Sequence, residues 1–143
     1  MSKLVIEGVG RTFPGVHGGA PTVALTPVSL SVADNDFITI LGPSGCGKST
    51  LLRIVAGLDR PSEGRVLLDG AEVRGPGADR GMVFQSYTLF PWLTIEQNIR
   101  FGLRERGMPE AQQKERAAYF IAKVGLRGFE QHFPKQLTGG MQQ

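Results

Sequence analysis

A glycine-rich run flanked by an apolar segment and a helical segment sets narrow limits on the fold of this chain. The run reads Gly42-Pro43-Ser44-Gly45-Cys46-Gly47-Lys48-Ser49-Thr50, which has the phosphate-loop spacing of Gly, four residues, and Gly-Lys-Ser/Thr. Residues 36–41, just before it, form a short apolar run typical of a buried parallel strand, and residues 48–56 read as a helix. The sequence therefore predicts an anion-binding loop between a strand and a helix N-terminus.

The residue types in this loop suit a chain of phosphates. Glycines let successive backbone N–H groups turn inward around an anion, and a helix N-terminus adds partial positive charge. We expect Lys48 to reach the β- and γ-phosphates of a nucleotide and the Ser49 hydroxyl to ligate Mg²⁺. The loop alone leaves kinases, GTPases and many ATPases open.

Composition excludes several other classes of protein. The chain has 143 residues, enough for one domain with a real core, and its formal net charge is only +3. Its Lys and Arg residues are scattered, so we expect no nucleic-acid partner. It has no apolar run of about 18 residues and no signal-peptide pattern, so we expect a cytoplasmic protein. The single cysteine, Cys46, excludes an internal disulfide.

The first half of the chain reads mainly as strands. Residues 3–9 and 28–32 are strand-like, with period-two alternation in the second segment, and they predict an antiparallel subdomain. Two further short strands are predicted at residues 64–70 and 81–84, each preceded by glycine or proline.

From Thr94 onward the apolar period lengthens to that of a helix. Thr94 and Gln97 have the capping-box spacing, and Glu96 and Arg100 form a favourable i,i+4 pair. Gly107 is predicted to end this helix. A second helix is predicted to begin near Pro109, with a buried stripe that ends before Gly125 and consists of Ala117, Phe120, Ile121 and Val124.

Four features, in order and spacing, resemble the ATP-binding subunit of an ATP-binding-cassette (ABC) transporter over essentially the whole chain. They are Phe13 upstream of the phosphate loop, Gln85 at a strand end, Leu137-Thr138-Gly139-Gly140 where the family has a Leu-Ser-Gly-Gly signature, and the helical region between the last two. The resemblance implies an α/β fold of the P-loop NTPase type. It would contain an antiparallel β subdomain, an incomplete parallel sheet and a helical subdomain, with the ATP-binding core at about 1–92 and the helical subdomain at about 93–143.

The resemblance also implies roles for individual residues. Phe13 would stack on adenine, although it could simply be a loop aromatic that packs on the first strands. Gln85 would sense the γ-phosphate and Mg²⁺, with Lys48 also acting in catalysis. Thr138, Gly139 and Gly140 would contact the ATP held by a second copy of the chain, because a threonine hydroxyl can donate to phosphate as serine does.

Within this family, the segments around Gln85 and residues 89–94 are similar to importers of nitrate, taurine and aliphatic sulfonates. The implied function is ATP binding and hydrolysis that drives uptake of such a small anion. The implied partners are a second ATP-binding subunit, a transmembrane permease and, indirectly, a solute-binding protein, at the cytoplasmic face of a bacterial inner membrane. The apolar cluster at residues 89–92 could receive the permease or could be buried in this domain.

Two groups that the family uses for hydrolysis are not found before Gln143. These are the strand that ends in Asp-Glu and the later switch histidine. We therefore expect the N-terminal half of a cassette, cut within the signature and inactive alone. A non-transporter ABC ATPase and a nucleotide-binding fragment without hydrolysis remain alternatives.

Overall fold

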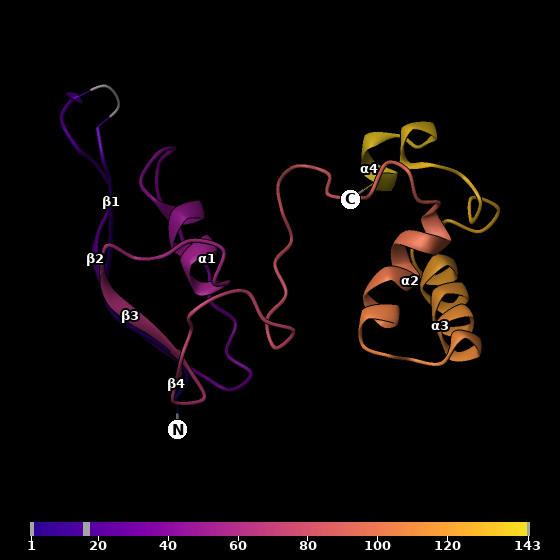
Figure 1. The fold of residues 1–143 in the computed structure, drawn as a ribbon, viewed down its shortest axis with the longest axis horizontal. Coiled ribbons are helices and arrows are strands. Elements are labelled where there is room, and N and C mark those ends of the chain that lie inside the picture. The colour runs from indigo at the N-terminus through magenta and orange to yellow at the C-terminus, as the bar shows by residue number, and fades with distance from the viewer. Residues whose placement is uncertain (1, 16–17, 143) are drawn as a thin grey trace. The chain divides into compact units, whose positions relative to one another are not determined.

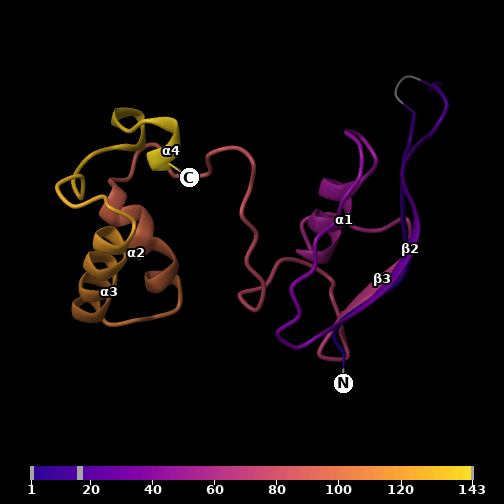
Figure 2. The same cartoon turned by 180° about the vertical axis from the view of Figure 1, so that it is seen from behind.

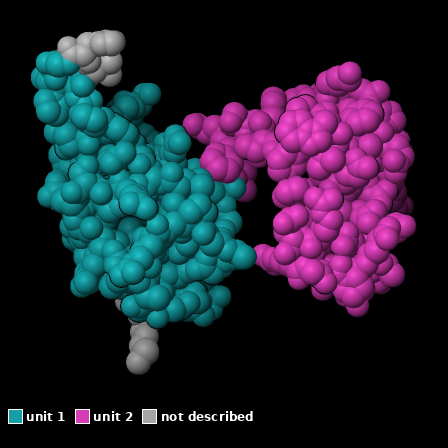
Figure 3. Space-filling model, in the orientation of Figure 1, with its two compact units in different colours: residues 1–82 teal, residues 83–143 magenta. Residues whose placement is uncertain are grey.

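The computed structural model describes residues 2–15 and 18–142. The chain divides into two compact units, residues 1–82 and 83–143 (Figure 3). No helix within the described ranges is long and apolar enough to cross a membrane. Leu89 and Phe90, just before the helices of the second unit, pack with them.

Unit 1 is built on an antiparallel sheet in the order β2-β1-β3-β4 (Figure 1). Its strands are β1 (Ser2–Phe13), β2 (Thr22–Ala33), β3 (Glu63–Leu68) and β4 (Ala71–Glu72). The antiparallel subdomain predicted from the sequence is confirmed, and β1 and β2 are longer than the predicted segments. Their alternating pattern is interrupted by register shifts, including one between Ile6 and Val9 at Gly8, whose φ is 56°.

The helix α1 (Lys48–Val55) lies on one face of this sheet (Figure 2). Leu51 and Ile54, three residues apart on α1, point to the same side and are buried. They form one core with sheet residues, namely Ile6, Val9, Leu25 and Val66. This core holds the start of α1 against the β1–β2 hairpin.

The strands predicted at 36–41 and 81–84 are wrong at the level of secondary structure. Neither segment forms a ladder with any described residue. Phe37 is 93% exposed, Leu41 86% and Val83 85%. An apolar run indicates only that the segment tends to be buried. A strand also needs a neighbouring strand that exchanges backbone hydrogen bonds with it.

Unit 2 is helical. It contains α2 (Ile95–Glu105), α3 (Glu110–Lys123), a short 3-10 helix, η2 (Pro134–Gln136), and α4 (Gly139–Gln142). Its core consists of Ile95, Ile121, Leu126 and Leu137. The two helices predicted after Thr94 are confirmed, except that Pro109 caps α3 instead of being its first residue.

The predicted buried stripe of α3 is only half correct. Ala117 and Ile121 are buried, as i and i+4 positions on one face should be. Phe120 and Val124 are 45% and 63% exposed. They lie at the edge of the apolar face, because each follows a buried residue by three positions and the helix turns it about 60° away from that residue.

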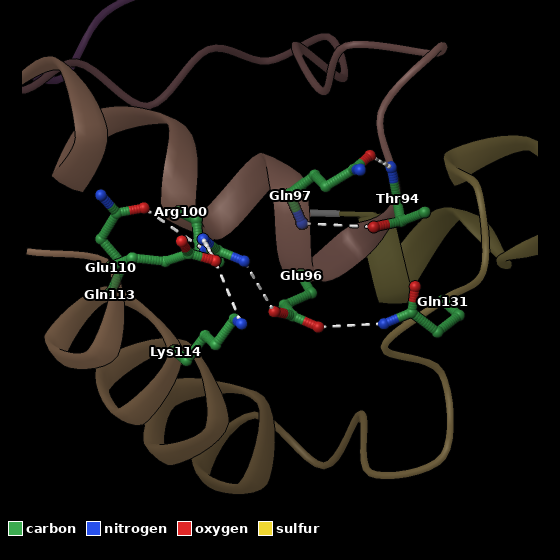
Figure 4. A network of polar contacts seen from close by, with 8 residues as sticks. All are labelled: Thr94, Glu96, Gln97, Arg100, Glu110, Gln113, Lys114 and Gln131. Atoms are coloured by element: carbon green, nitrogen blue, oxygen red, sulfur yellow. Dashed lines mark hydrogen bonds and ion pairs between the residues drawn. The ribbon is translucent and has the colours of Figure 1, made fainter.

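Polar contacts join α2 to α3 and to the chain that follows (Figure 4). The Arg100 guanidinium pairs with Glu96 at 3.2 Å, which confirms the predicted pair, and with Glu110 of α3 at 3.3 Å. The other oxygen of the Glu96 carboxylate accepts a hydrogen bond from Gln131 at 2.9 Å. The pKa of Glu110 is lowered by Lys114 and, to a smaller extent, by Arg100.

Thr94 closes the start of α2 with the predicted capping box. Its hydroxyl accepts from the Gln97 amide at 3.3 Å, and the Gln97 side chain accepts from the Thr94 amide at 2.9 Å. Thr94→Ala should lower the free energy of unfolding by about 1 kcal/mol, since one helix donor loses its partner. Urea unfolding measures this, with the exposed Thr88→Ala as control. Equal effects of the two substitutions would contradict the role of the cap.

Candidate functional site

The glycine-rich loop leads directly into α1 and has a backbone that few residues other than glycine can adopt. Gly45 and Gly47 have φ values of 82° and 96°. Gly47 caps α1, and its carbonyl accepts the first helical hydrogen bond from Leu51 at 2.9 Å. The left-handed conformation therefore fixes the direction in which the first amides of α1 point.

The loop is also packed closely at both ends. A Cβ on Gly47 would lie 2.6 Å from the carbonyl oxygen of Ala24 and 3.0 Å from the Leu25 side chain, both on β2. A Cβ on Gly42 would lie 2.7 Å from the Cys46 sulfur. The glycines thus let the loop form a compact concavity against the hairpin.

Lys48 supplies a positive charge to this concavity. Its ammonium donates to the carbonyl oxygens of Gly42 and Pro43, each at 2.7 Å, and lies 3.5 Å from the Cys46 sulfur. The side chain therefore folds back over the loop instead of extending into solvent. An ammonium held at a helix N-terminus, beside the unpaired amides of the first turn, can neutralise an anion such as a phosphate.

Ser49 and Thr50 occupy the first turn of α1, directly after Lys48. Ser49 is exposed, so its hydroxyl is accessible to a ligand at the mouth of the loop. A hydroxyl oxygen at this place suits a hard cation such as Mg²⁺, which prefers oxygen ligands. The metal role of Ser49 stays a prediction.

Phe13 lies at the end of β1, close to the same part of the hairpin. It is paired with Thr22 of β2, three residues before Leu25, which contacts the loop at Gly47. Three residues of strand span about 10 Å, so Thr22 lies about that far along β2 from the residue that contacts the loop. Phe13 is 38% exposed, as an aromatic that stacks on a ligand must be.

The other predicted site residues lie in unit 2. Gln85 is exposed. The carbonyl of Thr138 accepts from Met141 at 3.0 Å and Gln142 at 3.2 Å and so begins α4. A side chain on Gly139 would collide with the Tyr87 hydroxyl, which brings the segment after Gln85 next to the Thr138–Gly140 segment. The structure thus groups Phe13 with the loop, and the neighbourhood of Gln85 with the signature-like residues.

The apolar cluster at residues 89–92 is partly buried in unit 2 and partly exposed. Leu89 packs against the unit 2 core, and Phe90 is half-buried with its ring 4.6 Å from that of Phe101. Trp92 is 70% exposed. Met141, which departs from the glutamine common in the signature, also packs against this core, where a thioether fits an apolar gap.

Sequence reasoning missed two residues next to the predicted ones. Arg11 lies two positions before Phe13 on β1 and covers its ring, and Tyr87 adjoins Gly139. The period-two spacing of Arg11 and Phe13 was a usable signal, because alternate residues of a strand share a face. No local pattern pointed to the contact between Tyr87 and Gly139.

Comparison with known proteins gives close matches. A family model described as ABC transporter matches residues 25–143. An uncharacterised ABC transporter ATP-binding protein of Methanocaldococcus jannaschii is 55% identical over 99% of this chain and 52% of its own length. The nitrate import ATP-binding protein NrtD of a Synechocystis strain is 46% identical over 98% of this chain and 52% of its own.

The taurine import ATP-binding protein TauB of Burkholderia thailandensis is 46% identical over 100% of this chain and 54% of its own length. The chain thus spans about half the length of the curated relatives that it matches.

Solved structures match the fold. A dimeric post-hydrolysis state of the ATP-binding cassette MJ0796, bound to ADP and Pi, superposes with a TM-score of 0.85 at 32% identity, over 97% of this chain and 65% of that one. A second dimeric structure, described as a bacterial ABC transporter cassette, gives a TM-score of 0.86 over the same shares. The fold class predicted from the sequence is therefore confirmed.

Gly47 offers a direct test of the loop. Gly47→Ala should reduce MgATP affinity at least tenfold, about 1.4 kcal/mol, because the new methyl group meets Ala24 and the residue must leave its positive φ. Calorimetric titration measures the effect. Gly81→Ala, at a glycine of unit 1 with open space around it, is the matched control and should bind normally. Unchanged affinity in Gly47→Ala would show that nucleotide does not depend on this loop geometry.

Proposed function

The chain belongs to the ABC transporter family, and we propose that it binds MgATP at residues 42–50 as the ATP-binding and ATP-hydrolysing component of an importer. One observation carries the proposal. The Lys48 ammonium is held over a glycine concavity at the N-terminus of α1. This arrangement presents backbone donors and a fixed positive charge to the same small volume, as a polyphosphate requires.

ATP fits the residues that surround this loop. Gly42 and Gly47 let the loop backbone pack closely against Cys46 and β2, and Phe13 offers an exposed ring at the end of β1, paired with Thr22 of the strand that contacts the loop. The triphosphate would therefore bind residues 42–48 while the adenine stacks on Phe13. When bound, Mg²⁺ would neutralise phosphate charge, with the Ser49 hydroxyl as a protein ligand.

The Thr138–Gly140 segment is proposed to act on a second copy of the protein. It would donate to the phosphates of the ATP bound by the partner, so that two chains related by a two-fold axis share two sites. Two solved cassettes to which this chain is similar are described as dimeric, which supports the proposal. Gln85 would respond to the γ-phosphate, and the change would pass within unit 2 through Tyr87, which adjoins Gly139.

We propose nitrate, taurine or another sulfonate as the transported class, because relatives at 46% identity are named nitrate and taurine import proteins. The partners would be a transmembrane permease and, through it, a solute-binding protein. Their place would be the cytoplasmic face of the cell membrane. Trp92, exposed beside the half-buried Phe90, is the proposed anchor for the permease, since exposed tryptophans often dominate an interface.

Removal of the loop cation tests the nucleotide site. Lys48→Ala should weaken MgATP binding by about 1.5 to 3 kcal/mol, the scale of hydrogen bonds to a charged group. Isothermal titration calorimetry gives the value directly. Lys3→Ala is the matched control, because it removes a lysine of unit 1 whose ammonium pairs with Asp69 at 2.7 Å, and it should leave affinity unchanged.

Equal affinities for the protein and Lys48→Ala would contradict ATP binding at this loop. If Lys3→Ala weakened MgATP binding as much as Lys48→Ala does, the effect would come from the net charge of the protein. The position of Lys48 in the loop would then not explain the affinity.

A further inference from the structure

The Phe13 ring carries a cation on one face. The Arg11 guanidinium carbon lies 4.5 Å from the ring centroid, within the range of a cation–π contact. We propose that Arg11 is a positioning residue, which fixes Phe13 as the platform for the nucleotide base. The proposal rests on the proposed ATP site and concerns the binding of the base, not of the phosphates.

Arg11 is itself anchored to the chain that follows α1. Its guanidinium pairs with Asp59 at 2.9 Å, and both side chains are only 22% exposed. A sheltered pair is less screened by salt than one in open solvent. The Arg11 Nε atom is buried and has no hydrogen-bond partner among the described residues. The guanidinium is thus held by the ion pair on one side and the aromatic ring on the other.

Ser62 fixes the backbone on both sides of Arg11. The Ser62 amide donates to the carbonyl of Gly10 at 2.8 Å. Its hydroxyl accepts from the Thr12 amide at 3.0 Å and donates to the Thr12 carbonyl at 3.1 Å. The end of β1 that carries Phe13 is therefore bound to the segment 59–62 by three hydrogen bonds and an ion pair.

That segment is attached in turn to the last turn of α1. The amides of Leu58 and Asp59 both donate to the carbonyl of Arg53, at 2.9 and 3.3 Å. The phosphate loop begins the same helix. One rigid element thus carries the phosphate loop at its N-terminus and, through Asp59 and Arg11, supports the base platform from its C-terminus. Base and phosphates would be held at a fixed separation.

The experiment separates the base from the phosphates. MgATP and magnesium tripolyphosphate, which has no base, are titrated into the intact protein and into Arg11→Met. The variant should bind MgATP about three- to fivefold more weakly, the scale of a cation–π contact, and tripolyphosphate as well as the parent does. Arg74→Met, which removes an exposed arginine paired with Glu72, is the matched control and should change neither affinity.

A double-mutant cycle tests whether Arg11 acts on MgATP affinity through the Phe13 ring. In a Phe13→Leu background, Arg11→Met should have no further effect on MgATP affinity, because the ring through which it acts is gone. Arg11→Lys, which can still pair with Asp59, should recover part of the lost affinity. It also serves as the milder variant if Arg11→Met is unstable.

Two results would overturn the positioning role. One is a parallel loss of MgATP and tripolyphosphate affinity in Arg11→Met and Arg11→Lys, which would mean that Arg11 only supports the fold. The other is an unchanged MgATP affinity in both variants. If the parent protein bound neither ligand, the proposed ATP site itself would be wrong, and the inference would fall with it.

Discussion

The contact between Gly47 and β2 is the constraint on which the site depends. At this point the backbone approaches Ala24 so closely that no side chain fits, and the positive φ turns the chain into α1. The buried Leu51 and Ile54 then hold α1 on the sheet. The core and the close contact thus act on the same few residues and shape the loop, to whose Gly42 and Pro43 carbonyls the Lys48 ammonium donates.

The two units contribute different kinds of residue. Unit 1 holds the groups proposed to bind the phosphates and the base, all positioned by one hairpin and one helix. Unit 2 holds Gln85 and Thr138–Gly140, and its own core and the contacts of Arg100 join its helices. Each unit thus has its own hydrophobic core.

Local signals in the sequence predicted the elements whose causes are local. The capping residues Thr94 and Gln97, the stop at Gly107 and the loop glycines all act within a few residues, and the structure agrees. Segments 36–41 and 81–84 could not be judged this way, because a strand depends on a distant partner. The ion pair between Arg11 and Asp59 could not be predicted for the same reason, because the two residues lie 48 positions apart in the chain. The nearby Phe13 was predicted as a site residue.

Hydrogen–deuterium exchange with and without MgATP tests the central claim most directly, namely that the backbone of the glycine loop binds the phosphates. The account predicts slower exchange at the amides of residues 44–49, which would donate to the phosphates, and little change in the part of β2 far from the loop. Protection confined to other segments, with the amides of residues 44–49 exchanging at the same rate in both states, would contradict it.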